Sequence, residues 1–212
     1  MSACDVTGSG RSLRLVAVFY DAVVARWEPG AGGRLTDAAL ELFAEHGFRN
    51  VTVADVASYA GVTERTFYRH FATKEDVLFS DSEEILTLLL NAIDATPESS
   101  PAADALRNAT GALAAAFQGE RAHHRRRVKV VASDPQLVER DLLKQQAWSE
   151  TIAARLRARG TSAVRATVLA TAVTAAFRAA YAQWATDRAA RPLVDRVDAA
   201  IADLADDLTK LR

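Results

Sequence analysis

The stretch with the clearest potential for chemistry is GVTERTFYRHFATKEDVL at residues 61–78. In a helix over this stretch, Arg65 and Arg69 lie on one side with a neighbouring glutamate, whereas Phe67 and Phe71 are one turn apart and point back toward a core. An arginine can pair with O6 and N7 of guanine, and a glutamate can accept from the amine of cytosine. An ordinary amphipathic helix with a solvated charged face has the same composition, so both interpretations stand.

Two short helices position these side chains. Thr52 followed by Asp55 is typical of a capping box that opens the first, and Gly61 suits the turn after it because a left-handed backbone costs glycine nothing. Thr63 is placed to cap the second helix. A pair of this size matches a helix-turn-helix, whose second helix enters the major groove of DNA. Lys74, at the start of the next helix, adds a cation beside backbone N–H groups that attract phosphate.

The rest of the chain supports helix only, because apolar residues recur at spacings of three and four between scattered glycines and prolines. The sequence therefore predicts an all-α fold. Its expected helices are 34–46, a short one of about eight residues after Thr52, 63–70, 73–94, 101–118, 135–159, 162–187 and 192–211.

Composition restricts the class of protein. The 212 residues are 50% apolar and 25% charged, which suits a soluble globular protein. Lys and Arg number 26 against 27 Asp and Glu, so any binding of nucleic acid must be local. The single cysteine, Cys4, fits a reducing compartment, and no segment has the roughly 20 uninterrupted apolar residues of a membrane span. We expect a cytoplasmic protein without a membrane partner.

Longer strings carry a specific resemblance. AALELFAEHGF is followed by TVADVA, AGVT, TFYRHF and TKEDVL, and together they closely resemble the DNA-binding domain of TetR-family transcriptional regulators over residues 34–80. The resemblance implies a three-helix DNA-binding domain at 34–80 and a larger ligand-binding and dimerisation domain at 81–212. It also implies a homodimer that binds a pseudo-palindromic operator as a repressor until a small molecule releases it.

The resemblance also implies the residues that contact DNA. Thr52, Tyr68 and Lys74 match the family's phosphate contacts, Arg69 is treated as a further one, and the base-reading positions follow Thr63 at the start of the recognition helix. The predicted DNA-binding residues are Thr52, Thr63, Glu64, Arg65, Thr66, Tyr68, Arg69 and Lys74.

Residues 1–33 depart from the family pattern. Many members carry a cationic arm before the first helix, whereas here Glu28 and a glycine-rich segment precede Arg34. The upstream residues Phe19, Tyr20 and Trp27 look like an added packing helix over 11–28. Such a helix, a disordered segment and a mis-assigned start codon are interpretations that the residues leave open.

The last two helices predict a dimer interface. Helix 162–187 is alanine-rich, so another helix can approach it closely, and the final helix carries Leu193, Val197, Ile201, Leu204 and Leu208 at helical spacing. In the family these helices pair across a two-fold axis. The alternative is that both stripes belong to the core of a monomer.

Five aromatic residues are candidates for an apolar effector cavity. Three lie on one face of helix 162–187 and two come from neighbouring helices, an arrangement equally typical of a solid core. The predicted effector-binding residues are Phe117, Trp148, Phe177, Tyr181 and Trp184.

The basic run RAHHRRRVKVV at 121–131 allows three interpretations. A solvated helical face is favoured over a nucleic-acid patch. A metal site is disfavoured, because His123 and His124 point about 100 degrees apart on a helix and nothing nearby completes a coordination set. Residues 125–160 also look similar to mycofactocin-type TetR regulators, which implies an acyl-CoA-like effector whose phosphates these cations would neutralise.

Other functional classes fit less well. The chain has no glycine-rich phosphate loop, no G-x-S-x-G and no HExxH, so we expect neither an enzyme nor a cofactor. A helical protein-interaction module would explain the amphipathic helices but not the spacing from Thr52 to Lys74.

Overall fold

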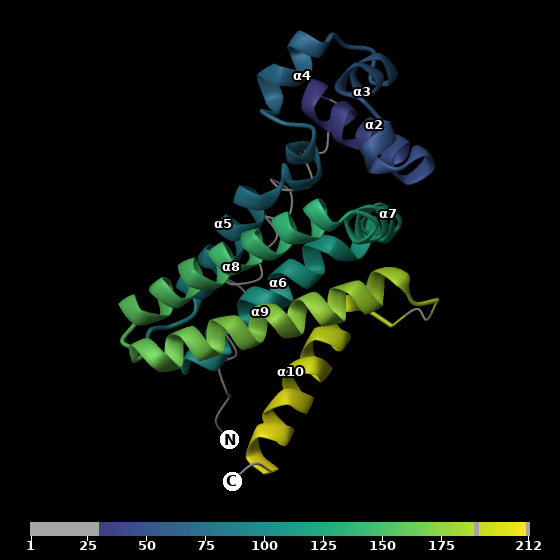
Figure 1. Ribbon diagram of the computed structural model, residues 1–212. Coiled ribbons are helices and arrows are strands. Elements are labelled where there is room, and N and C mark those ends of the chain that lie inside the picture. The colour runs from purple at the N-terminus through teal and green to yellow at the C-terminus, as the bar shows by residue number, and fades with distance from the viewer. Residues whose placement is uncertain (1–29, 189–190, 211–212) are drawn as a thin grey trace, which may run out of the picture.

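The computed structural model describes residues 30–188 and 191–210, and within them all regular structure is helical (Figure 1), which confirms the predicted all-α fold. The predicted extra helix at 11–28, with Phe19, Tyr20 and Trp27, lies outside the described residues. Helices α2, α3 and α4 gather at one end of the molecule, and the remaining helices form the larger part (Figure 1).

The first described helix, α2 (Ala31–His46), begins three residues earlier than the pattern predicts. Gly32 and Gly33 lie in its first turn, where the first backbone N–H groups have no helical partner in any case. A Cβ atom at Gly32 would lie 3.5 Å from Nδ1 of His70, so the glycine is compatible with close packing on α4. The 3-10 turn η2 (Phe48–Asn50) follows Gly47, which has a φ of 83°.

Threonine caps begin the two short helices that follow, α3 (Val53–Tyr59) and α4 (Glu64–His70), and the cap of α3 is reciprocal. The Thr52 backbone N–H donates to the Asp55 carboxylate at 2.8 Å, and the Asp55 N–H donates to the Thr52 hydroxyl at 3.2 Å. Thr63 caps α4 by accepting from the N–H of Thr66. Gly61 has a φ of 67° in the intervening turn, so both the predicted caps and the predicted glycine turn are confirmed.

The predicted continuous helix over 73–94 is wrong in one respect, because a turn at Ser80 and Asp81 interrupts it. The 3-10 helix η3 (Glu75–Phe79) precedes the break, and α5 (Ser82–Ala95) follows it. Val77, Leu78 and Phe79 are all buried, and three consecutive residues cannot share one face of an α-helix. Tertiary packing therefore overrides the helical period here.

The larger part of the molecule begins with α6 (Ala102–Phe117) and the turn η4 (Gln118–Glu120). They are followed by α7 (Arg121–Ala132), α8 (Pro135–Ala158), α9 (Ala163–Thr186) and α10 (Leu193–Lys210). The predicted α8 start is confirmed, because the Asp134 carboxylate accepts from the N–H of Gln136 at 2.9 Å. Helix α5 packs against α6, α8 packs against α9, and α10 lies against α9 and α6.

The hydrophobic core does not divide at the start of the larger part. Val130 and Val131 of α7 and Leu137 of α8 are buried in the same cluster as the cores of α2, α3 and α4. Helices α7 and α8 therefore pack into the base of the small domain.

Candidate nucleic-acid interface and ligand cavity

Helix α4 has two faces, as the sequence predicts. Phe67 and Phe71 are buried at 0% and 8% exposure, whereas Arg65 and Arg69 are exposed and Tyr68 is 56% exposed. The Phe67 ring lies edge-on to Tyr68, with 5.6 Å between ring centroids. The buried rings anchor α4, so its other side presents two guanidinium groups and a phenol in fixed positions.

The threonine hydroxyls that are predicted to contact DNA already take part in hydrogen bonds at the starts of α3 and α4. The Thr52 hydroxyl donates to the Asp55 carboxylate at 2.6 Å, and hydrogen bonds from Thr52 lower the pKa of Asp55. The hydroxyls of Thr63 and Thr66 are 3.1 Å apart. These hydroxyls are held at the N-termini of α3 and α4, where a helix favours anions.

Lys74 is fixed by the chain before α3. Its ammonium donates to the backbone carbonyls of Phe48 and Val51 at 2.7 and 2.8 Å and lies 4.2 Å from the centroid of the Phe48 ring. An ammonium has three N–H donors, so these two bonds leave one for an outside acceptor. Lys74 therefore holds η2 and η3 together as well as presenting charge.

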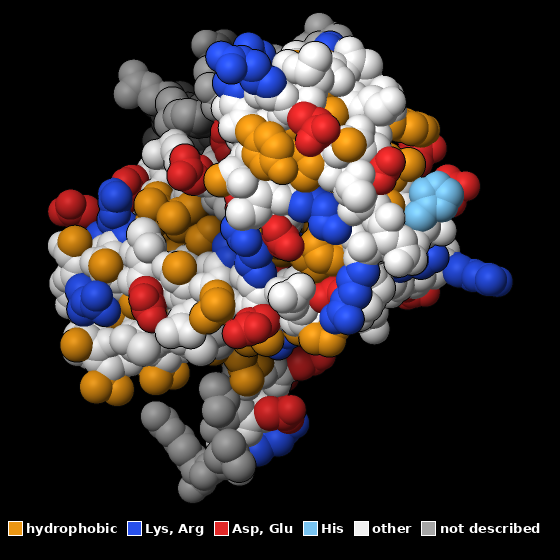
Figure 2. All heavy atoms as spheres, turned by 45° about the horizontal axis from the view of Figure 1, so that its top comes forward, with side chains coloured by type: hydrophobic (Ala, Val, Ile, Leu, Met, Phe, Trp, Pro, Cys, Tyr) orange, Lys and Arg blue, Asp and Glu red, His pale blue; other side chains and the backbone are white. Residues whose placement is uncertain are grey.

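Surface charge around this end of the molecule is mixed. Figure 2 shows lysine and arginine side chains interspersed with carboxylates rather than gathered into one broad patch. This agrees with the net charge of −1 and confines any attraction for a polyanion to local groups.

The larger part of the molecule contains a cavity between α5, α6, α7, α8 and α9, with about 790 Å³ of empty space including the solvent at its mouth. Phe117, Trp148, Phe177 and Tyr181 line it, so four of the five predicted aromatic residues come together. Trp184 does not line the cavity. It is fully buried with Leu193 and Val197 of α10, because the next helix covers that side of α9.

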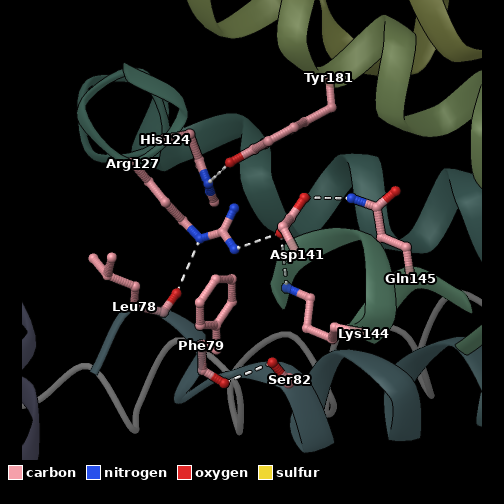
Figure 3. A network of polar contacts seen from close by, with 9 residues as sticks. All are labelled: Leu78, Phe79, Ser82, His124, Arg127, Asp141, Lys144, Gln145 and Tyr181. Carbon is pink, nitrogen blue, oxygen red and sulfur yellow. Dashed lines mark hydrogen bonds and ion pairs between the residues drawn. The ribbon is translucent and has the colours of Figure 1, made fainter. Parts of the chain in front are cut away.

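One end of the cavity is polar (Figure 3). Arg127 of α7 donates to the backbone carbonyl of Leu78 at 3.1 Å and to the carboxylate of Asp141 at 3.2 Å. The Lys144 ammonium lies 3.4 Å from the same carboxylate, which also accepts from Gln145. His124 and Tyr181 meet at 3.0 Å between Nδ1 and the hydroxyl.

Burial perturbs several of these groups. The pKa of Lys144 is lowered to about 8, first by burial and then by the charge of Arg127. Burial also lowers the pKa of His124 to about 3, so its ring is neutral near pH 7, and burial raises the pKa of Tyr181. Perturbed groups beside an apolar cavity are typical of binding sites.

The basic run forms the solvated face that the sequence favours only in part. Arg125, Arg126 and Lys129 are exposed, as that face requires. Arg121 and Arg125 also donate through Nε to the carbonyls of Trp184 and Ala185 at 3.0 Å, which satisfies free acceptors at the C-terminus of α9. Arg127 lines the cavity instead.

Several polar contacts join the helices of the cavity to the small domain. Arg127 binds the Leu78 carbonyl in η3, Arg49 pairs with Asp134 at 2.6 Å, and Arg140 pairs with Asp76. The pairing with Arg49 is the main cause that lowers the pKa of Asp134. The helices around the cavity are thus joined to the small domain both by these side-chain contacts and by the common hydrophobic cluster.

Sequence reasoning did not single out Arg127, although one interpretation assigned the cations of the basic run to the phosphates of an effector, and it missed Asp141, Lys144 and Gln145. A signal was present, because Lys144, Gln145 and Trp148 follow Asp141 at the third, fourth and seventh positions, on one side of α8. That stripe continues the aromatic lining into a polar end. Within the described part of the chain, no three histidine, cysteine, aspartate or glutamate side chains cluster as metal ligands would.

Helix α9 leaves much of its apolar surface uncovered. It is long and apolar enough by composition to cross a membrane, and only 17% of its most apolar window is buried. Val164 is 77% exposed and Val168 is 58% exposed. A core helix of a soluble protein passes the same test of length and composition, so what covers this face must be inferred from other observations.

Two family models match the chain. Residues 35–80 match the model of bacterial regulatory proteins of the tetR family, and residues 100–209 match the MftR C-terminal domain. Among curated proteins, the chain is 32% identical over 134 residues to MftR of Mycobacterium tuberculosis, a protein with a proposed role as regulator of mycofactocin biosynthesis. That alignment covers 63% of this chain and 68% of MftR.

Solved structures share the fold. FadR from Thermus thermophilus in complex with lauroyl-CoA is 20% identical with a TM-score of 0.55, and the match covers 81% of this chain and 91% of that one. FadR from Bacillus subtilis in complex with stearoyl-CoA is 18% identical with the same TM-score, over 80% and 95% of the two chains.

Proposed function

The chain belongs to the TetR family of bacterial transcriptional regulators, and we propose that it is a dimeric repressor released from its operator by a small apolar or amphipathic effector. The observation that carries this proposal is the presentation of α4, with Arg65, Tyr68 and Arg69 exposed on one side while Phe67 and Phe71 anchor the other.

The proposed DNA contacts divide into two roles. Glu64, Arg65 and Thr66 lie at the start of α4 and read base edges, because the N-terminal residues of a recognition helix reach farthest into the major groove. Backbone contacts fix the register without carrying sequence information. The proposed phosphate contacts are Thr52, Thr63, Tyr68, Arg69 and Lys74.

The proposed dimer forms through α9 and α10. Val164 and Val168 expose apolar surface on α9, and Val194 is 37% exposed at the start of α10. A second copy of the same helices would bury this surface in an isologous contact, which suits two operator half-sites. Sedimentation at micromolar concentration tests this contact, and a monomer there contradicts it.

The proposed effector occupies the cavity of the larger domain. Its apolar lining suits an acyl chain, and the two FadR structures were solved with lauroyl-CoA and stearoyl-CoA, so an acyl-CoA-like effector is our leading candidate. An effector lowers DNA affinity only if it prefers the conformation that binds DNA poorly, and DNA must then lower effector affinity by the same factor.

The test uses fluorescence anisotropy with duplexes from the region around the protein's own gene. Arg65→Ala should weaken binding to the cognate duplex by about 1–3 kcal/mol and relax preference at one base pair, because a bidentate contact to a base is lost. Arg157→Ala is the matched control, since Arg157 is exposed on α8 in the larger domain.

Two results would contradict the proposal. One is that no duplex from that region binds specifically at moderate salt, where nonspecific attraction to phosphates is weakened. The other is that Arg65→Ala and Arg157→Ala bind the cognate duplex alike.

A further inference from the structure

Two cations with little exposure lie at the polar end of the cavity. Arg127 and Lys144 line it together with the carboxylate of Asp81, and a second carboxylate, Asp141, pairs with both cations. A third lining cation, Arg178, is exposed on α9, so solvent screens its charge. Cations beside an apolar cavity are groups with which an anionic ligand can form strong hydrogen bonds.

The two inner cations have little water around them. The side chains of Arg127 and Lys144 are 12% and 15% exposed, and the Asp141 side chain between them is 18% exposed. One carboxylate oxygen serves both cations, at 3.2 Å from Arg127 and 3.4 Å from Lys144. Among the described residues, Asp141 is the one carboxylate within ion-pair distance of the Lys144 ammonium, whose three N–H donors therefore have room for a further acceptor.

The other close neighbours of the Lys144 ammonium are mainly aromatic rings. It lies 4.8 Å from the centroid of the Phe79 ring and 4.7 Å from that of Trp148, so aromatic faces supply much of its contact. Its lowered pKa agrees, because burial and the neighbouring Arg127 charge disfavour the ammonium more than Asp141 and Asp81 favour it. An added anion would relieve both effects.

An apolar channel continues directly from this pair. The lining beyond the polar end is aliphatic and aromatic, and its residues come from four helices: Leu89, Leu106, Leu113, Phe117, Ile152 and Phe177. A ligand that satisfies the whole cavity therefore has a compact anion at one end and an apolar chain behind it.

We propose that Arg127 and Lys144 form the receiving site for the anionic group of an amphiphilic effector, whose apolar chain lies along the aromatic part of the cavity. The anion competes with Asp141 for both cations. The role of this ligand as the effector rests on the proposed function. The anion site itself rests on the cavity residues alone.

Competition between the ligand and Asp141 for Arg127 would also affect the small domain. Arg127 donates to the Leu78 carbonyl and lies 5.3 Å from the centroid of the Phe79 ring, so a ligand that reorients its guanidinium changes the support of η3. Residues 77–79 are buried in the same core as α2 and α4. The anion site is thus placed where binding energy can alter the position of the DNA-contacting helices.

The test compares three ligands with the same chain length in the absence of DNA. Dodecanoate presents a carboxylate, dodecanoyl-CoA presents phosphates, and 1-dodecanol presents no anion. Isothermal titration calorimetry on the wild-type protein should show at least one anionic ligand binding roughly tenfold or more tightly than dodecanol, because hydrogen bonds to charged groups are the stronger ones. Preference for dodecanoate identifies a carboxylate, and preference for dodecanoyl-CoA alone identifies the phosphates.

Lys144→Met assigns that preference to the site. The substitution keeps the aliphatic part of the side chain and removes the ammonium, so the anionic ligand should fall to within about threefold of dodecanol. Retained dodecanol binding shows that the variant is folded. Lys129→Met is the matched control, since Lys129 is exposed on α7, and it should keep the wild-type preference.

Three results overturn the inference: dodecanol binding as tightly as both anions, a preference that survives Lys144→Met, or no binding of any of the three ligands. These measurements contain no DNA. A failure of operator binding therefore leaves them unaffected, and a failure here leaves the assignment of the α4 surface intact.

Discussion

Helices α4 and α7 are both short and basic, yet they use their cations in opposite ways. Arg65 and Arg69 of α4 project from the surface and make no hydrogen bond or ion pair within the described residues. Arg121 and Arg127 of α7 are instead turned inward, against backbone carbonyls and a carboxylate. The difference shows that a basic run does not by itself indicate an external binding surface, because internal acceptors can turn its guanidinium groups inward.

The reason for the contrast lies in what each helix packs against. Helix α4 anchors itself with Phe67 and Phe71 and therefore leaves its cations outside. Helix α7 buries His123, His124, Val130 and Val131 instead, and its arginines meet the ends of other helices. Arg127 of α7 therefore contributes to the stability of the domain junction, whereas the cations of α4 are available to an external anion.

The largest effect expected from this comparison is on stability at the junction. Arg127→Met should lower the free energy of unfolding by about 3 kcal/mol, because it leaves the buried Asp141 carboxylate and the Leu78 carbonyl short of a donor. Urea unfolding followed by circular dichroism measures the change. Arg126→Met, on the exposed side of the same helix, should change it by less than about 0.5 kcal/mol. Equal losses in the two variants would remove the distinction between buried and exposed cations of α7.

An intermediate effect is expected at Lys74, which combines both roles. Lys74→Met should lower the free energy of unfolding by about 1–2 kcal/mol through the loss of two bonds to carbonyls. The substitution should also weaken binding to all DNA sequences by the same factor. The slope of log affinity against log salt concentration should fall by about one unit, since one phosphate contact is lost. Unfolding in urea and anisotropy titrations over a range of salt measure the two parts.

Arg69→Met is the companion variant for that measurement. Its side chain is exposed, so stability should stay unchanged while DNA binding weakens. A Lys74 variant as stable as the Arg69 variant would show that the carbonyl contacts of Lys74 contribute nothing.

The smallest effect concerns pH. Because the folded pKa of Lys144 is lowered to about 8, the folded protein loses this proton before the unfolded chain does. The unfolded state then binds more protons between about pH 8 and pH 10, so this group makes stability rise with pH in that window by on the order of 1 kcal/mol. The charged neighbours that face it are Arg127, Asp81 and Asp141, and the raised pKa of Tyr181 opposes the trend only above pH 10.

The measurement compares urea unfolding of the wild type and Lys144→Met from pH 7 to pH 10. The stability of the variant relative to the wild type should fall across this window. In the wild type alone, deprotonation of Lys144 removes an unfavourable buried charge. A difference in the free energy of unfolding that stays constant with pH would show that burial does not disfavour the charged form of Lys144.

Much of the fold was predictable from the sequence, because helix ends depend on neighbours three or four residues away. The capping pair of Thr52 and Asp55, the glycine turn at Gly61 and the aspartate cap at Asp134 all formed as expected. The two faces of α4 follow from the same local spacing. The assignment of individual residues to DNA contacts stays a prediction.

Tertiary structure alone decided which charges and aromatic rings meet. Arg127 is 14 residues from Asp141 and 49 from Leu78, and no periodic pattern along the chain encodes contacts over such separations. The same holds for Trp184, which α10 covers, and for the break before α5, where burial of three consecutive residues outweighs helical periodicity. The sequence by itself determined the helices, their caps and the family. Packing of distant helices determined that the cations of α4 face outward while Arg127 of α7 lines the polar end of a cavity.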